Sequence, residues 1–252
     1  MTVWYMNGAG NDFAVIDARN INIDMSDMAR RLCEGRGCDG FMALDNSSIA
    51  DFKLHFYNSD GSRAEMCGNG ARCICRFAYD NGIVGEKMTV ETDAGIVCGQ
   101  RIGENIYRVR LNTPRDIEFN KRDGIDYCVV GVPHAVIEVD ALDFDDTDKL
   151  FERARNIREE LNANVNFYSR LSEDTVRIMT YERGVEDFTL ACGTGSGAVA
   201  TIVWNKNKAQ SCSLILQNRG GKLKVEADTN ENEITALYLE GGAEIDEIEE
   251  II

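Results

Sequence analysis

Hydrophobic and polar residues alternate strictly in several short segments of the chain. Segment 51–57 places Phe52, Leu54 and Phe56 on one side and polar or amphipathic residues on the other. Segment 175–183 alternates in the same way, and shorter runs of this kind occupy 107–111 and 237–239. Alternation with a period of two is typical of a strand with one buried face, so the pattern predicts strands at these four places.

Other segments carry apolar residues at helical spacing. In 25–33 the apolar side chains recur every three or four positions, with Ser26 as the expected N-cap, and 150–161 repeats the pattern. Helices and short strands therefore alternate along the chain without a regular βαβ order. The sequence predicts an α+β fold in which mixed or antiparallel sheet wraps a central helix.

The chain also resembles itself at a separation of 125 positions. Cys67-Gly-Asn-Gly is matched by Cys192-Gly-Thr-Gly, each is followed by an apolar run of helical length, and each of those by a strand-like segment that ends at Gly95 or Gly220. A repeat of this length indicates a duplicated domain rather than a solenoid, whose repeats span about 20–50 residues. We therefore expect two similar, pseudo-symmetric halves, residues 1–117 and 118–252, with the C-terminal tail free to return to the first half.

Charge and composition exclude several classes of partner. The chain has 252 residues and a net charge of −16, and no basic run that would attract phosphate groups, so nucleic acid is not expected to bind. The longest apolar run, 198–204, is far shorter than the ~20 residues that cross a bilayer, and the first residues lack the features of a secretion signal. The expected location is the cytoplasm, with no membrane partner; a homodimer stays open.

The chain has nine cysteines but only two histidines, and no pair of Cys-x-x-Cys motifs occurs. A structural zinc site is therefore not expected, and cytosolic thiols stay reduced, which argues against a disulfide framework. Most of these cysteines should be small buried residues.

Cys67 and Cys192 differ from the other cysteines because each precedes a Gly-x-Gly turn and a helix. Unpaired backbone N–H groups at a helix N-terminus attract anions and favour a thiolate. Two such thiols on opposite faces of one carbon are what inversion of a stereocentre requires, one removing a proton and the other delivering one. Two alternatives stay open: a nucleotide phosphate held by the glycine-rich turns, and a thiol redox or binding protein in which the pair forms a reversible disulfide.

Five motifs together resemble diaminopimelate epimerase, in that family's order and over nearly the whole chain. They are Asn7–Phe13, Ala64–Cys73, Gly131–Val136, Tyr181–Gly184 and Ala191–Gly195. The family is similar in fold to proline racemase and to the phenazine-biosynthesis isomerase. The resemblance implies an active site in the cleft between two halves, with no pyridoxal phosphate, no metal and no other cofactor.

The resemblance also implies roles for individual residues. Cys67 and Cys192 would be the catalytic acid/base pair. The reacting end of an amino-acid substrate would lie against five residues: Asn11, Gly68, Asn69, Gly193 and Thr194. The distal end, with its own carboxylate and ammonium, would lie against four others: Asn58, Asn164, Glu182 and Arg183.

The expected activity is cofactor-independent interconversion of L,L- and meso-diaminopimelate, in lysine and peptidoglycan biosynthesis. Many family members have Asn where Val132 stands here, and valine cannot hydrogen-bond a substrate through its side chain. A related epimerase or racemase acting on lanthionine, histidine, lysine or glutamate is therefore the alternative. His134, in a Pro-His turn, is expected to support the fold rather than to act as a base.

Overall fold

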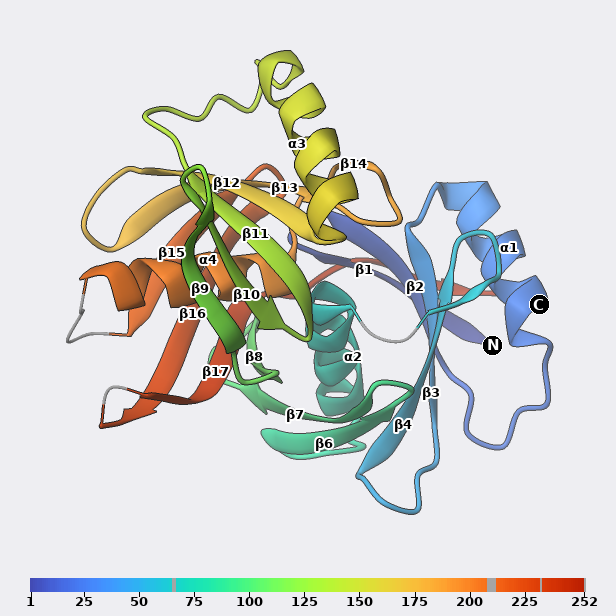
Figure 1. Ribbon diagram of the computed structural model, residues 1–252. Helices are drawn as coiled ribbons and strands as arrows, with labels where there is room; N and C mark the ends of the chain where they lie inside the picture. Colours follow the sequence, from blue (N-terminus) through green and yellow to red (C-terminus); the bar gives the residue numbers. More distant parts are fainter. Residues whose placement is uncertain (65–66, 208–211, 232, 252) are drawn as a thin grey trace. The chain divides into compact units, whose positions relative to one another are not determined.

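The computed structural model describes residues 1–64, 67–207, 212–231 and 233–251 (Figure 1). The described residues form two compact units: Met1–Val109 with Gly241–Ile252, and Arg110–Glu240. The internal repeat of the sequence predicted a division between residues 117 and 118, whereas the contacts of the folded chain divide it between Val109 and Arg110. The reason is that β9 (Arg115–Arg122) pairs antiparallel with β10 (Ile125–Val130) and so belongs with the second unit.

The first unit holds two helices and a set of short strands. In chain order they are β1 (Thr2–Gly8), β2 (Asn11–Asp17), α1 (Met25–Arg36), β3 (Gly40–Asp45), β4 (Phe52–Asn58), β5 (Arg63–Ala64), α2 (Gly68–Asp80), β6 (Lys87–Thr92), β7 (Gly95–Arg101), β8 (Ile106–Leu111), whose last two residues fall beyond the division, and β18 (Glu244–Glu250).

The second unit repeats this order. After β9 and β10 come β11 (Val132–Glu138), α3 (Asp148–Leu161), β12 (Asn164–Arg170), β13 (Thr175–Glu182), β14 (Asp187–Phe188), α4 (Gly193–Asn207), β15 (Ser213–Asn218), β16 (Gly221–Asn230) and β17 (Glu233–Gly242), whose last two residues fall beyond the division.

Strand pairing follows the same scheme in both units. β2 is parallel to β3, β3 antiparallel to β4 and β4 parallel to β6; β11, β12, β13 and β15 pair in the same way. The registers also agree, since Phe13 lies opposite Gly40 and His134 opposite Asn164. Each unit has one added strand, with β18 antiparallel to β1 and β9 antiparallel to β10. The predicted α+β fold with two pseudo-symmetric halves is confirmed.

Each unit has one central helix and one outer helix. In α2 and α4 nearly every residue of the first three turns is buried, which is typical of a helix surrounded by other elements. α1 and α3 bury only one stripe each, and α1 packs on the face of β2 and β3 that carries Ala14, Ile16 and Phe41. The opposite face of these strands packs on α2, where Phe13 and Met42 flank Gly70. Strand alternation thus separates an inner and an outer core layer.

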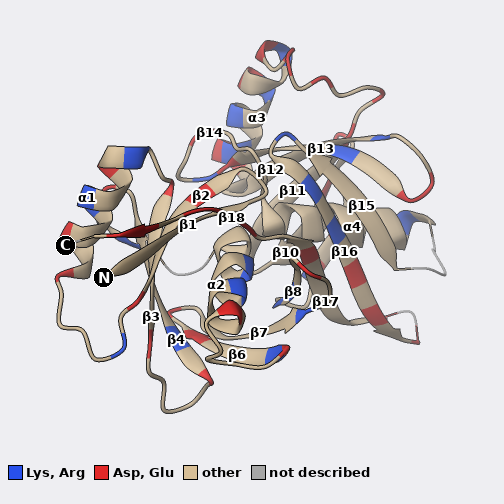
Figure 2. Cartoon of the chain, turned by 180° about the vertical axis from the view of Figure 1, so that it is seen from behind, with Lys and Arg blue, Asp and Glu red and all other residues tan. Residues whose placement is uncertain are grey.

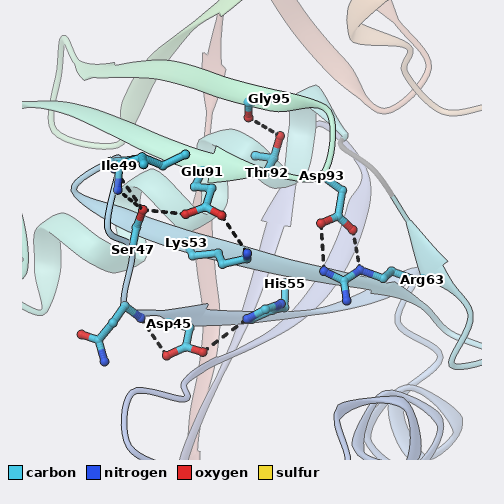
Figure 3. Close-up of polar contacts among 12 residues, drawn as sticks. Asp45, Ser47, Ile49, Lys53, His55, Arg63, Glu91, Thr92, Asp93 and Gly95 are labelled. Carbon is cyan, nitrogen blue, oxygen red and sulfur yellow. Dashed lines mark hydrogen bonds and ion pairs between the residues drawn. The ribbon is translucent and has the colours of Figure 1, made fainter.

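The predicted alternation of β4 is also confirmed. Phe52, Leu54 and Phe56 are buried, while Lys53 and His55 point outward. The outward side chains pair with acidic neighbours: Lys53 Nζ lies 2.7 Å from Glu91, and His55 Nε2 lies 3.3 Å from Asp45 (Figure 3). Partly exposed pairs of this kind contribute little to stability, so the buried face of β4 determines its register.

The start of α1 differs from the expectation. Its N-cap is Asp24, whose side chain accepts a hydrogen bond from the Asp27 backbone, whereas Ser26 already lies in the first turn and donates to the Gly61 carbonyl. A carboxylate is as good a cap as a hydroxyl and also complements the helix dipole. Among the described helices, none is both long and apolar enough to cross a membrane.

The C-terminal tail returns to the first unit as β18, an acidic strand along most of its length (Figure 2). Arg36 at the end of α1 bridges Glu247 and Glu249 of this strand. The last residue of the tail, Ile252, lies outside the described residues.

Candidate active site

Cys67 lies at the beginning of α2, in the first unit. It is the N-cap, with extended backbone angles of φ −123° and ψ 128°, and its carbonyl accepts the first helical hydrogen bond from Ala71 at 2.8 Å. The half-buried thiol therefore lies beside the N–H groups of the first turn, which carry partial positive charge. Glu65 and Met66 of the motif lie outside the described residues.

Two of the predicted substrate-binding residues meet at this turn. Asn69 is buried and its Nδ2 donates to Asn11 Oδ1 at 2.7 Å. Asn11 Nδ2 in turn donates to Asp39 Oδ2 at 3.1 Å, and Asp39 also accepts from the Asp12 backbone. Asn58, at the end of β4, is exposed and bonds Ser62 Oγ at 2.9 Å.

Cys192 occupies the corresponding place before α4, in the second unit. Its carbonyl accepts from Ser196 at 2.9 Å, and its Sγ accepts from the Gly195 N–H at 3.3 Å. Thr194 Oγ1 lies 3.5 Å from the same sulfur. An N–H donated to sulfur at a helix N-terminus favours the thiolate over the thiol.

Glu182 lies against Cys192, at the end of β13. Burial raises the pKa of the Glu182 carboxyl above its usual value, while hydrogen bonds with Thr189 and Cys192 act in the opposite direction. The Thr189 hydroxyl donates to Glu182 Oε1 at 2.6 Å. A carboxyl with a raised pKa beside a thiol is suited to exchanging a proton with it.

Asn164 and Arg183 lie at the same end of the sheet. Asn164 is buried, and its Oδ1 accepts from the Arg183 backbone N–H at 2.8 Å. The Arg183 side chain is exposed, with Nη1 3.1 Å from the Asn162 carbonyl. The guanidinium therefore retains donors that can bind an anion.

A buried polar cluster supports the first turn of α4. Asn166 Nδ2 donates to the Ala135 carbonyl at 2.9 Å and lies 3.2 Å from His134 Nδ1, while Thr180 donates to Asn166 Oδ1 at 2.9 Å. A Cβ added to Gly195 would lie only 2.4 Å from Asn166 Oδ1. Glycine is therefore required for the turn that carries Cys192 to rest on this cluster.

Other thiols have different surroundings. Burial raises the pKa of Cys73, Cys75 and Cys128 to about 12, so these side chains stay protonated and unreactive. Within the described ranges, His, Cys, Asp and Glu form no group of three or more that could hold a metal ion.

Comparison with known proteins places this arrangement in a family. A sequence model described as "Diaminopimelate epimerase" matches residues 3–108 and 127–245. The chain belongs to the diaminopimelate epimerase family. The family's enzyme from Aquifex aeolicus is 39% identical over 88% of each chain, and that from Archaeoglobus fulgidus is 37% identical over 94% of this chain and 91% of the relative.

Solved structures of more distant proteins share the fold of this chain. A Bacillus anthracis protein of the PhzF phenazine-biosynthesis family aligns with a TM-score of 0.77 at 16% identity, covering 100% of this chain and 99% of that one. A probable proline racemase from Agrobacterium radiobacter aligns with a TM-score of 0.73 at 14% identity, covering 100% and 92%. Both confirm the expected fold.

Several predicted site residues of this family member occupy equivalent positions in the two halves. Cys67, Gly68 and Asn69 begin α2 as Cys192, Gly193 and Thr194 begin α4. Asn58, opposite Gly40 at the end of β4, corresponds by register to Glu182, beside Asn164 at the end of β13. The two halves therefore carry different polar groups at two equivalent positions: Asn69 and Thr194 at the first, and Asn58 and Glu182 at the second.

Three residues that the sequence analysis did not single out take part in the site. Asp39 binds Asn11, Thr189 binds Glu182, and the buried Arg72 binds Asn69. No local pattern identifies Asp39 or Thr189, because both act across strands that pair only in the folded chain. Arg72 had one available signal, its position among apolar residues in the helix that follows Cys67, although Arg76 on the same helix shares that signal.

His134 is expected to make stability depend on pH. Burial lowers its pKa to about 3, from an ordinary value of 6.5, and the charge of Arg183 acts in the same direction. Between these values the unfolded chain binds more protons, so the free energy of unfolding falls as the pH falls, by about 3 kcal/mol from pH 6.5 to 4. Denaturant unfolding of wild type and His134→Gln across this range measures the effect. Parallel pH curves for the two proteins would contradict it.

Proposed function

We propose that this protein interconverts L,L- and meso-diaminopimelate in lysine biosynthesis, with Cys67 and Cys192 as the acid/base pair and without a cofactor. The supporting observation is that each half places one cysteine at the N-terminus of its buried central helix, in a chain of this family. The seven other cysteines lack this setting.

The proposed reaction moves one proton at each face of the α-carbon. One cysteine, as thiolate, removes the α-proton and becomes a thiol, while the other, as thiol, delivers a proton to the opposite face and becomes a thiolate. Helix N-terminal N–H groups around Gly68 and Gly193 stabilise the negative charge that develops on the α-carboxylate. The reverse reaction uses the same two groups in exchanged roles.

Glu182 supports the second thiol in this proposal. Its carboxyl bonds Cys192 and has a raised pKa, so it can take the proton of Cys192 in the direction in which Cys192 acts as the base, and give a proton to Cys192 in the direction in which Cys192 has acted as the acid. Arg183 and Asn58 would bind the distal carboxylate and ammonium of the substrate, because a guanidinium pairs with carboxylates and an amide oxygen accepts from an ammonium.

The direct test is proton exchange in deuterated water. Reduced protein is incubated with L,L-diaminopimelate, without pyridoxal phosphate or metal, and the α-proton signal is followed by NMR. Loss of the signal together with appearance of the meso isomer supports the proposal. If folded, reduced protein leaves the signal unchanged, diaminopimelate is not its substrate.

Arg183→Ala distinguishes diaminopimelate from a substrate without a distal carboxylate. Loss of a charged hydrogen bond is expected to raise KM for diaminopimelate by about 10- to 100-fold, with a smaller change in kcat. Lysine and histidine, which lack that carboxylate, should be turned over equally by wild type and variant if either is the true substrate. Steady-state kinetics on the panel of lanthionine, lysine, histidine and glutamate decides between them.

A further inference from the structure

Arg72 is a cation enclosed within the first unit. Its side chain is fully buried on α2, one turn after Cys67. The guanidinium donates to three uncharged oxygens: Gly68 O at 3.2 Å, Asn69 Oδ1 at 3.0 Å and Gly242 O at 3.4 Å. Among the described residues no carboxylate contacts the guanidinium, and an arginine is almost never fully buried without such a partner, so its presence at this position points to a functional role.

The contacts of Arg72 begin a directed series of hydrogen bonds. Arg72 can only donate, so Asn69 must turn its Oδ1 toward the guanidinium and its Nδ2 toward Asn11. Asn11 must then accept with Oδ1 and turn its own Nδ2 toward Asp39, which can only accept as a carboxylate. A cation at one end and an anion at the other thus impose the same direction on both amides.

This direction matters because an asparagine amide is nearly symmetric in shape. Its oxygen and nitrogen exchange places by a rotation of 180°, which turns a donor into an acceptor at the same point in space. A site that binds a carboxylate needs donors, and a rotated amide would present an oxygen to it.

We propose that Arg72 is a positioning residue, which fixes the amide orientation of Asn69 and, through it, of Asn11, so that both present N–H groups to the substrate carboxylate. This inference rests on the proposed function and deepens it. Asp39 completes the orientation from the opposite end.

Arg76 provides a matched control on the same helix. One turn beyond Arg72, it also reaches the segment that precedes β18, through the Ala243 carbonyl, and bonds Asp80 Oδ2 at 3.2 Å. It has no contact with Asn69 or Asn11 among the described hydrogen bonds. Arg76→Met therefore removes a comparable side-chain bond to the segment before β18, while the amides of Asn69 and Asn11 keep their orientation.

The experiment compares Arg72→Met, Arg72→Lys and Arg76→Met with wild type. Both Arg72 variants are expected to lower kcat/KM for diaminopimelate by about 10- to 100-fold, chiefly through KM. Methionine donates no hydrogen bond, and lysine keeps the charge but cannot contact all three oxygens at once. Arg76→Met should stay within about twofold of wild type. Wild-type kinetics in Arg72→Lys would overturn the proposal, since charge alone would then be sufficient. If Arg72→Met does not fold, Arg72→Lys still decides.

A second readout does not require turnover. Side-chain amide NMR of Asn69, without substrate, should show one slowly exchanging pair of N–H signals in wild type and Arg76→Met. In the Arg72 variants the pair should shift and exchange faster with solvent. Unchanged Asn69 signals in Arg72→Lys and Arg72→Met would refute the orienting role. Should wild type fail to epimerise diaminopimelate, the proposed function fails while this measurement still tests the orientation.

Discussion

Replacing Cys67 or Cys192 by alanine is expected to lower kcat for epimerisation by roughly 10³-fold or more, because each variant lacks either the base or the acid of the reaction. Serine at the same positions should retain at most slow activity, since a hydroxyl is a much poorer base than a thiolate. Conversion of L,L- to meso-diaminopimelate, followed by NMR, measures the effect. Neither alanine substitution is expected to unfold the protein, because each removes only one sulfur atom.

Exchange in deuterated water makes this prediction sharper. A variant that keeps one cysteine of the pair can still remove a proton from the face that this cysteine serves and return deuterium to the same face. Each single alanine variant should therefore exchange the α-proton of only one stereoisomer, without inversion, and the two variants should prefer opposite isomers. Cys98→Ala, at an exposed position on β7, is the control and should match wild type. Full epimerisation by either Cys67→Ala or Cys192→Ala would exclude the two-base mechanism.

The sequence was sufficient to predict the repeated core of each half. The Cys-Gly-x-Gly turn, the apolar helix after it and the alternation in β4 are local patterns, and local patterns survive in the fold. The strand predicted at 175–183 is also present as β13, but its burial alternates only as far as Ile178, because both of its faces are buried from there to Tyr181. The repeat at 125 positions turned these separate predictions into a pseudo-symmetric architecture. It could do so because the strand registers are also repeated, as for Gly40 and Asn164.

Other elements carry too little local pattern to predict. β9 is exposed along nearly all its length, and β18 is mostly acidic, so neither shows an apolar face. Both become strands because β10 and β1 offer them backbone partners. The same limit applies to the site, where the burial of Arg72 and the bond of Asp39 with Asn11 depend on residues distant in the chain, and Thr189 reaches Glu182 only because the chain turns back between β13 and β14.

Gly195→Ala is expected to destabilise this protein strongly. The new methyl carbon would lie 2.4 Å from Asn166 Oδ1, 2.9 Å from Thr180 Oγ1 and 3.2 Å from the Cβ of Cys192. Asn166 cannot yield without breaking its bonds with Ala135 and Thr180, so the free energy of unfolding should fall by about 2–4 kcal/mol. Epimerisation should fall as well, since the Gly195 N–H that binds Cys192 Sγ is displaced.

Two other helical glycines calibrate this prediction. Gly35 in α1 has open space around its added Cβ, so Gly35→Ala should stabilise the protein by about 0.5–1 kcal/mol through helix propensity alone. Gly70 in α2, at the position equivalent to Gly195, would place its Cβ 3.1 Å from the Met42 sulfur, which can move. Denaturant unfolding should therefore rank the alanine variants Gly35, Gly70 and Gly195 in decreasing stability. If Gly195→Ala were as stable as Gly70→Ala, the prediction would be wrong. Asn166 and Thr180 would then be able to move away from the new methyl group, and the position of Cys192 would not depend on them.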